Sequence, residues 1–205
     1  VAGRVPDTAV AERTEPVVLL SGNLGYRPTV RGATWFAKRV WPRVLEQCPD
    51  ARWVLAGARP AAGVRRLSRL SGVEVHADLP DLAAFLGAAR MTIAPMSSGS
   101  GVPMKVLEAM AAGLPAVVHP WAAAGLGGDA GEAVAVASES DEWVDAVVGL
   151  LGDQQRALDL GRRGHELWRQ NYHPDRVADQ IRSLIDEVAG AEPFDVQSLG
   201  SSGIR

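Results

Sequence analysis

The sequence has few of the features of a secreted, membrane-spanning or nucleic-acid-binding protein. It contains one cysteine, Cys48, which excludes an internal disulfide and a cysteine-based metal cluster and favours a reducing compartment. No apolar run is long enough to cross a bilayer. The net charge of −3 is small and the 21 basic residues are scattered, so we do not expect nucleic acid as a partner. We expect a globular protein of the cytoplasm.

Short apolar runs alternate with longer amphipathic segments along most of the chain. The expected strands cover residues 17–21, 52–57, 73–77, 91–95, 115–120 and 132–136, and the expected helices cover 29–47, 60–71, 81–90 and a segment that begins at about 102–103. Continuous Val, Ile, Leu and Ala strands, each followed by a helix, are typical of a parallel sheet covered on both faces. The sequence therefore predicts an α/β fold, a Rossmann-like open parallel sheet of about six strands.

The composition also suggests where the domain begins and ends. Residues 1–15 mix charge, Ala and Pro without periodicity, which favours a linker. Residues 16–190 have the patterning of one domain, in which strands and helices alternate up to residue 138 and only helices follow. Residues 191–205 are expected to be a flexible tail.

Ligands of an open parallel sheet bind beyond the carboxyl ends of its strands, so the loops after the strands are the candidate site. Three loops carry suitable residues: 21–23, 56–57 and 97–103. In the third, Gly99 and Gly101 allow the backbone to approach a ligand closely, and Pro103 suits the first position of the following helix.

Lys105 and Glu108 are the charged residues in the first turns of that helix. Helical projection puts Val106, Leu107, Met110 and Ala111 on one side, and Lys105, Glu108, Ala109 and Ala112 on the other. A lysine at a helix N-terminus is unfavourable unless an anion such as a phosphate binds nearby. Glu108 can accept hydrogen bonds from hydroxyl groups such as those of a ribose. The pair therefore indicates a nucleoside diphosphate site, with an exposed ion pair of no function as the alternative.

At this point the sequence resembles a known family. The run GSGVPMKVLEAMAAGLPAVV (99–118) resembles the donor-site motif of the group-1 glycosyltransferases, the retaining enzymes of the GT-B fold. The runs SGNLGYRPTVRGATWF (21–36) and GVEVHADLPDLAAFLGAARMTIAP (72–95) follow the order of the family. The resemblance covers about residues 16–190. It implies the C-terminal, nucleotide-sugar-binding half of a two-domain enzyme.

The resemblance also implies roles for individual residues. Lys105 and Glu108 would be the catalytic residues, contacting the diphosphate and the ribose of the donor. The implied donor-binding set is Gly22, Asn23, Gly57, His76, Asp78, Leu79, Gly99, Ser100, Gly101, Val102, Lys105 and Glu108. Within it, residues 76–79 would hold the base and residues 99–102 would lie beside the sugar.

The chain departs from the family pattern in its donor-site residues and in its length. A second glutamate often lies upstream of Glu108, and Ser100 takes its place here. A phosphate-binding Arg or Lys often follows the first strand, for which Arg27 and Arg31 are candidates. The chain also has no room for the N-terminal acceptor-binding domain, so we expect it to bind donor and to transfer little by itself.

The resemblance implies a metal-independent hexosyltransferase of polysaccharide biosynthesis that uses no cofactor beyond its nucleotide-sugar donor. Its partners would be the missing N-terminal domain and a sugar, glycan or lipid-linked acceptor. The basic helix at 156–170 could touch an anionic membrane surface, although a solvated face is the simpler interpretation.

Two other functions are compatible with this architecture. A nucleotide-sugar epimerase would need acid–base carboxylates and histidines clustered in the cleft, which the pattern does not supply. A non-catalytic nucleotide-sugar-binding subunit or scaffold would explain Ser100 and the absent domain. His119 and Trp121, at the ligand-side edge of the sheet, are expected to pack or to cap a loop, and His165 and His173 to lie on the surface.

Overall fold

The computed structural model describes residues 14–99, 101–127 and 130–190, which contain one six-stranded parallel sheet. The strands are β1 (Val17–Asn23), β2 (Arg52–Ala58), β3 (Val73–Ala77), β4 (Met91–Ala94), β5 (Ala116–Val118) and β6 (Ala135–Val136). They lie in the order β3-β2-β1-β4-β5-β6. The predicted Rossmann-like fold is therefore confirmed. Most of the expected linker and all of the expected tail lie outside the described residues.

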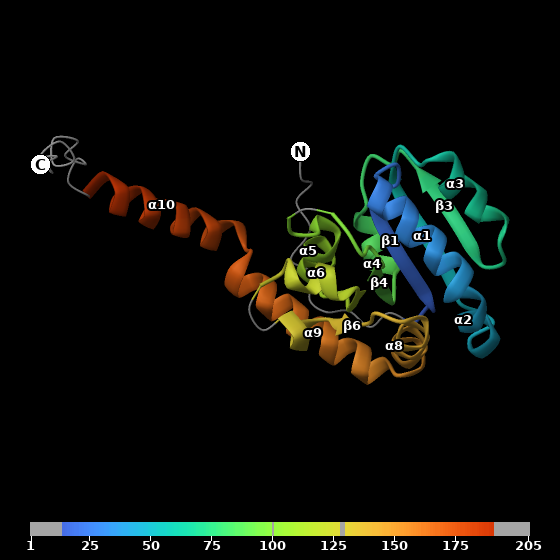
Figure 1. The fold of residues 1–205 in the computed structure, drawn as a ribbon. Coiled ribbons are helices and arrows are strands. Elements are labelled where there is room, and N and C mark those ends of the chain that lie inside the picture. Colours follow the sequence, from blue (N-terminus) through green and yellow to red (C-terminus); the bar gives the residue numbers. More distant parts are fainter. Residues whose placement is uncertain (1–13, 100, 128–129, 191–205) are drawn as a thin grey trace, which may run out of the picture.

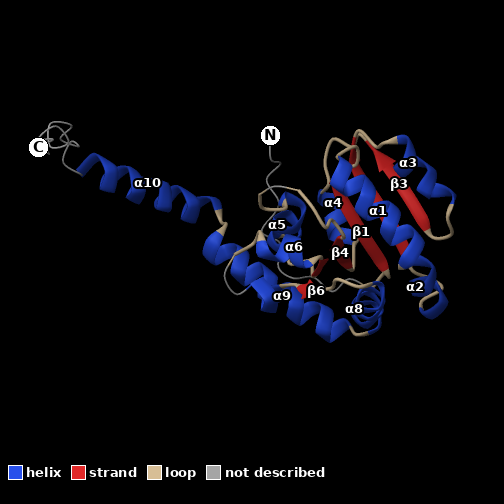
Figure 2. Ribbon diagram, in the orientation of Figure 1, coloured by secondary structure: helices blue, strands red, loops and turns tan. Residues whose placement is uncertain are grey.

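Helices cover both faces of the sheet (Figure 2). They are α1 (Arg27–Arg39), α2 (Trp41–Gln47), α3 (Ala62–Arg65), the 3₁₀ helix η1 (Arg66–Arg69), α4 (Ala83–Ala88), α5 (Met104–Ala111), α6 (Pro120–Ala124), α7 (Ala130–Ala133), α8 (Ser140–Gly152), α9 (Gln154–Asn171) and α10 (Pro174–Gly190). Helices α1, α2 and α8 bury their apolar sides on one face. Helices α4, α5 and α6 pack on the other.

Large aromatic side chains fill the core on the α1 side of the sheet. The ring centroid of Phe36 lies 4.8 Å from that of Trp53 and 5.9 Å from that of Trp143. Trp41 is fully buried beside them, and its indole N–H donates to the carbonyl of Ser71. Rings of this size contribute much of the buried apolar area of a small domain. The packing fixes α1, α2 and α8 against the sheet.

The prediction of one helix over residues 29–47 was wrong. Helix α1 ends at Arg39 and α2 begins at Trp41, with Val40 between them. The cause is Pro42, which lacks the N–H that a continuous helix would donate to the carbonyl of Lys38. Pro42 instead occupies the first turn of α2, where that missing N–H costs nothing.

Two further segments differ from the sequence prediction. Residues 60–71 form the short α3 and η1 rather than one helix, and Val64 is the one buried residue of the two. Residues 132–136 were expected to be a strand, but 130–133 are helical and β6 has two residues. Ala130, Ala133 and Val134 are buried at helical spacing, and this packing overrides the alternating pattern of the sequence.

Helix α9 supports the far end of α5 from behind. A Cβ placed on Gly161 would lie 2.3 Å from the carbonyl oxygen of Gly113, so the two backbones are in direct contact. His165, expected on the surface, is partly buried instead, with its Nδ1 3.2 Å from the carbonyl oxygen of Met110 and 3.1 Å from that of Ala111. An imidazole N–H can satisfy carbonyls that a helix end leaves free.

Helix α10 extends away from the rest of the molecule (Figure 1). It carries a row of exposed apolar side chains, namely Val177, Ile181, Leu184, Ile185 and Val188. This spacing puts them on one side of the helix. Within the described residues, no helix combines the length and the hydrophobicity that crossing a bilayer would need.

Candidate functional site

The strand order places a crevice at the carboxyl ends of β1 and β4. Strand β1 pairs with β2 on one side and with β4 on the other, so the successive connections leave β1 in opposite directions. This is the point of an open α/β sheet at which loops separate and ligands bind. The segment at the end of β1, around Gly22, and the segment that leads from β4 into α5 face each other there.

Gly22 and Gly57 bring the backbones of β1 and β2 unusually close at this edge. The two residues are paired in the sheet, and their φ angles are +110° and +156°. A Cβ on Gly57 would lie 1.8 Å from the carbonyl oxygen of Gly22. Glycine is therefore required at position 57, and the end of β1 is left without side-chain cover.

Lys105 reaches across this crevice from the first turn of α5. A Cβ built on Gly22 would lie 3.6 Å from Cε and 3.9 Å from Nζ of Lys105. The ammonium group is largely buried, and within the described residues it has no hydrogen bond and no ion pair. Burial lowers the pKa of Lys105, and the nearby Glu108 raises it in part. A partly buried cation is stabilised by a nearby negative charge, so this position favours an anion.

Glu108 lies one turn further along the same side of α5. Burial raises the pKa of Glu108, and the charge of Lys105 lowers it in part. Among the described side chains, no acidic oxygen lies within 4 Å of the Lys105 ammonium. The alternative of an exposed ion pair is therefore wrong. Both residues are partly buried at the edge of the crevice.

The N-terminus of α5 is open toward the crevice. Its N-cap residue is Pro103, no side chain caps the helix, and its first turn contains no acidic residue. Pro103 was expected at the first helical position and lies one residue before it. The two projected sides of α5 pack into different clusters, with Val106 and Met110 in one and Ala109 and Ala112 in the other. Uncapped N–H groups and the helix dipole favour an anion at this end.

The loop that leads into α5 presents mainly backbone. Gly99 and Gly101 have φ angles of +146° and +72°, and Val102 is exposed. Ser100 lies outside the described residues. The structure therefore brings Gly22, Gly57 and Lys105 together and leaves Gly99, Gly101 and Val102 at the mouth of the same crevice.

The loops after β2 and β3 are joined through Asp78. Its backbone N–H donates to the carbonyl of Gly57 over 2.8 Å, and its Oδ1 accepts from the N–H of Arg59 over 2.8 Å. Both Asp78 and Arg59 have left-handed φ angles, +52° and +49°. Non-glycine residues in this region need support from their surroundings. Asp78 thus shapes the loops, as does Asn23, whose Oδ1 accepts from the N–H of Gly25.

Replacing Asp78 with alanine is expected to lower the free energy of unfolding by about 1–2 kcal/mol, because the N–H of Arg59 loses its acceptor and alanine tolerates the left-handed conformation poorly. Asp78→Asn should retain most of the stability, since asparagine keeps both properties. Urea unfolding would measure the change, with the exposed Asp50→Ala as the matched control. Equal effects of Asp78→Ala and Asp50→Ala would contradict this role.

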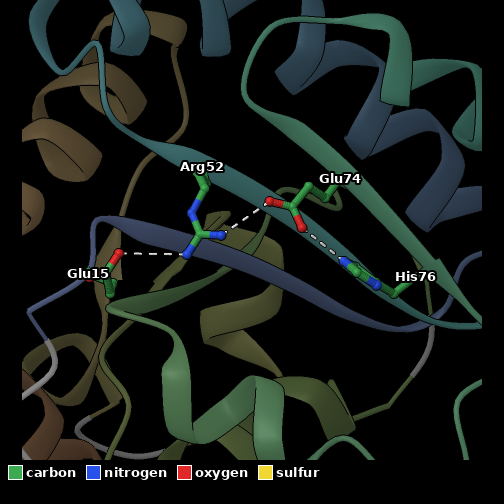
Figure 3. A network of polar contacts seen from close by, with 4 residues as sticks. All are labelled: Glu15, Arg52, Glu74 and His76. Carbon is green, nitrogen blue, oxygen red and sulfur yellow. Dashed lines mark hydrogen bonds and ion pairs between the residues drawn. The ribbon is translucent and has the colours of Figure 1, made fainter.

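His76 belongs to a chain of polar contacts across the edge of the sheet (Figure 3). Its Nε2 lies 3.0 Å from Oε2 of Glu74, and the other oxygen of Glu74 lies 3.4 Å from Arg52, which also pairs with Glu15 at 3.7 Å. The ring centroid of His76 is 5.0 Å from that of Phe85. Leu79 packs with Phe85 against the core on this face. His76 and Leu79 therefore lie on β3 and the loop after it, away from Lys105 in the sheet order.

Ser21 lies in one of the three loops expected to form the site, and the expected capping by His119 and packing of Trp121 are confirmed. Ser21, directly before Gly22, is fully buried, and its hydroxyl has no partner in the part of the chain that the structure describes. Trp121 packs over Gly99. A buried serine at the end of an apolar strand gives a weak sequence signal, and the contact of Trp121 depends on tertiary packing. Arg27 and Arg31, the sequence candidates for a phosphate ligand, are exposed.

The arrangement can bind an anion and a hydroxyl-bearing group side by side. Lys105, the α5 N-terminus and the bare backbone at Gly22 would hold a phosphate, and Glu108 would accept from hydroxyls. No group of three His, Cys, Asp or Glu side chains able to hold a metal ion occurs among the described residues.

Comparison with known proteins yields a family match. A family model described as "Glycosyl transferases group 1" matches residues 15–153, more than half of the chain. An uncharacterised 44.6 kDa protein in the cps region of Klebsiella pneumoniae is 22% identical over 173 residues, which cover 80% of this chain and 44% of that protein.

Solved structures share the fold at low sequence identity. S. aureus TarM, crystallised with UDP among other ligands, has a TM-score of 0.71 at 12% identity, covering 89% of this chain and 38% of TarM. Anabaena HepE, in complex with UDP and glucose, has a TM-score of 0.65 at 17% identity, and the match covers 86% of this chain and 49% of HepE. The C-terminal domain of a group 1 family glycosyl transferase, LpcC of Francisella tularensis, has a TM-score of 0.56 at 15% identity. This match covers 77% of this chain and 86% of the LpcC domain. The chain thus spans less than half of TarM, HepE and the Klebsiella protein.

Proposed function

The chain belongs to the glycosyl transferases group 1 family, and we propose that it is the donor-binding half of a retaining GT-B hexosyltransferase. In this role it holds a nucleoside diphosphate sugar for transfer of the glycosyl group to an acceptor. A sugar, glycan or lipid-linked molecule would be the acceptor, bound by an N-terminal domain that pairs with this one. Three further points stay predictions: a cytoplasmic location, a role in polysaccharide biosynthesis and peripheral contact with a membrane.

The position of Lys105 carries this proposal. A partly buried ammonium with no hydrogen bond or ion pair among the described residues lies against Gly22, at the open N-terminus of α5 and the carboxyl ends of β1 and β4. A diphosphate bound at this point would place its negative charge beside the ammonium and the helix N-terminus. Glu108, on the same side of the helix, lies where a neighbouring ribose could donate hydrogen bonds to it.

The remaining donor contacts are assigned by the resemblance and by place in the fold. Gly22, Asn23 and Gly57 border the diphosphate, the backbone of residues 76–79 borders the base, and residues 99–102 border the sugar. The left-handed residues Arg59 and Asp78 support this assignment, because backbone strain is concentrated at functional sites.

The chemistry we propose for this half is electrostatic. When the bond between the sugar and the phosphate breaks, negative charge grows on the leaving diphosphate. Lys105 and the N–H groups at the start of α5 stabilise that charge because they are already oriented toward it. These groups supply the positive charge without a metal ion, and the donor itself is the only small molecule required.

The lengths of the relatives support a second domain as the partner of this one. The chain covers 38–49% of TarM and HepE, and it covers most of the C-terminal domain of LpcC. The apolar row on α10 has no partner among the described residues, as expected of a surface that meets another domain. The acidic side chains of α10 outnumber its basic ones, which makes an anionic membrane a poor partner for this helix.

Titration calorimetry with UDP, GDP, ADP and dTDP tests the proposal. We expect one of the four to bind in the micromolar range, with unchanged affinity in the presence of EDTA. The result would also identify the base. If a folded chain binds none of the four nucleotides, donor binding by this half is overturned and a scaffold function is favoured. Loss of binding in EDTA would instead contradict metal independence.

A further inference from the structure

Trp121 is held firmly at the edge of the crevice. It lies in α6, which follows β5, and its backbone N–H donates to Nδ1 of His119, the N-cap residue, over 3.1 Å. This bond needs a neutral imidazole with a free lone pair at Nδ1. The indole is partly buried against a small apolar cluster that includes Met96, Val118 and Leu126. Both the backbone and the ring of Trp121 are therefore fixed by their neighbours.

The indole ring lies against the glycine loop that leads into α5. A Cβ on Gly99 would be 2.8 Å from Cη2 of Trp121 and 3.4 Å from Cζ2 and Cζ3. At the other end of α6, a Cβ on Gly125 would be 3.2 Å from the carbonyl oxygen of Gly101 and 3.5 Å from Cδ of Pro103. Helix α6 thus contacts the loop at two places.

The loop needs this support. Gly99 and Gly101 both have left-handed φ angles, and glycine loses more conformational freedom on ordering than any other residue. Among the described residues, Trp121 is the large side chain that limits the motion of Gly99. A rigid element beneath a ligand-binding loop reduces the entropy that binding must remove.

We propose that Trp121 is a positioning residue for the glycosyl group of the donor, which it acts on through the backbone of Gly99. The inference rests on the proposed function, in which the sugar lies beside Gly99, Gly101 and Val102 and the diphosphate lies at Lys105. Because Trp121 lies against Gly99, on the sugar side of the proposed donor site, it supports the sugar more than the diphosphate. Replacing Trp121 therefore reduces the ratio of the affinity for the nucleotide sugar to the affinity for the nucleoside diphosphate.

The test compares affinities for UDP and UDP-glucose, and for GDP and GDP-mannose, by calorimetry on the full chain. In Trp121→Leu we expect the affinity for the sugar nucleotide that binds to fall about 10-fold, and that for its nucleoside diphosphate to change less than about 2-fold. Trp168→Leu is the matched control, because Trp168 packs partly buried against the same apolar cluster from α9. It should leave the ratio of the two affinities unchanged.

Variants of His119 provide the second arm. His119→Ala removes the cap that fixes Trp121. Like Trp121→Leu, it should lower the affinity for the sugar nucleotide relative to that for the nucleoside diphosphate. His119→Asn should restore it, because asparagine is a good N-cap residue. If Trp121→Leu weakens both ligands equally, or neither, the positioning role is overturned while the donor site stands. The positioning role is also overturned if the wild-type chain binds UDP or GDP as tightly as the corresponding sugar nucleotide. A wild type that binds no nucleotide overturns the proposed function itself.

Discussion

Replacing Lys105 with methionine is expected to weaken nucleoside diphosphate binding about 100-fold, the loss that accompanies removal of one strong charge-assisted contact. Methionine has a similar shape and keeps the apolar contacts of the lysine stem. The effect would therefore report the charge rather than the packing. Titration calorimetry with the nucleotide that the wild type selects would measure it.

The same substitution should make the ligand-free protein more stable, by about 1 kcal/mol. Burial lowers the pKa of Lys105 in the folded state, so the charged form opposes folding. This penalty is fully present below the lowered pKa and disappears as the pH rises to the ordinary value of a lysine. The stabilisation by Lys105→Met should shrink over the same interval. Urea unfolding at several pH values would show it.

A pH dependence of binding follows from the same charge. A bound phosphate favours the protonated ammonium, so binding raises the pKa of Lys105 and the affinity falls as the pH rises through the lowered pKa of the free protein. Calorimetry in buffers of different ionisation enthalpy would detect the uptake of protons.

The matched control is Lys38→Met, which removes the other lysine of the sequence from the exposed end of α1. It should change neither the affinity nor its pH dependence. If Lys105→Met destabilises the free protein and leaves the affinity intact, Lys105 is a structural residue and the site is wrongly assigned.

Replacing Gly57 with alanine is expected to lower the free energy of unfolding by about 3 kcal/mol or more. The new Cβ would lie 1.8 Å from the carbonyl oxygen of Gly22, and the φ angle of +156° is unfavourable for alanine. The strands β1 and β2 would have to separate at their carboxyl ends. Because Gly22 lies against Lys105, nucleotide affinity should fall as well.

Thermal and urea unfolding would measure the loss of stability. Gly63→Ala is the control, because a Cβ on Gly63 meets open space within the helix α3 and should be neutral or slightly stabilising. An effect of Gly57→Ala no larger than that of Gly63→Ala would mean that the close contact of β1 and β2 relaxes easily.

The sequence predicted the fold class correctly because continuous apolar strands followed by helices leave few alternatives to a parallel sheet. Its errors arose where local and tertiary preferences compete. The break at Val40 had a local signal in Pro42, whereas the helix at 130–133 depends on buried alanines that alternate in the sequence like a strand. His165 was misplaced because the carbonyl groups that it meets belong to α5.

By itself the sequence determined the parallel sheet, the open helix end with its lysine, and the loops that had to lie at the carboxyl edge. These follow from residue spacing, which acts over one or two turns of chain. Only the tertiary structure decided that Lys105 is buried against Gly22, that Gly57 must be glycine, and that Trp121 supports Gly99. Such contacts join segments far apart in the chain. They depend on the strand order, which the periodicity of each segment does not encode.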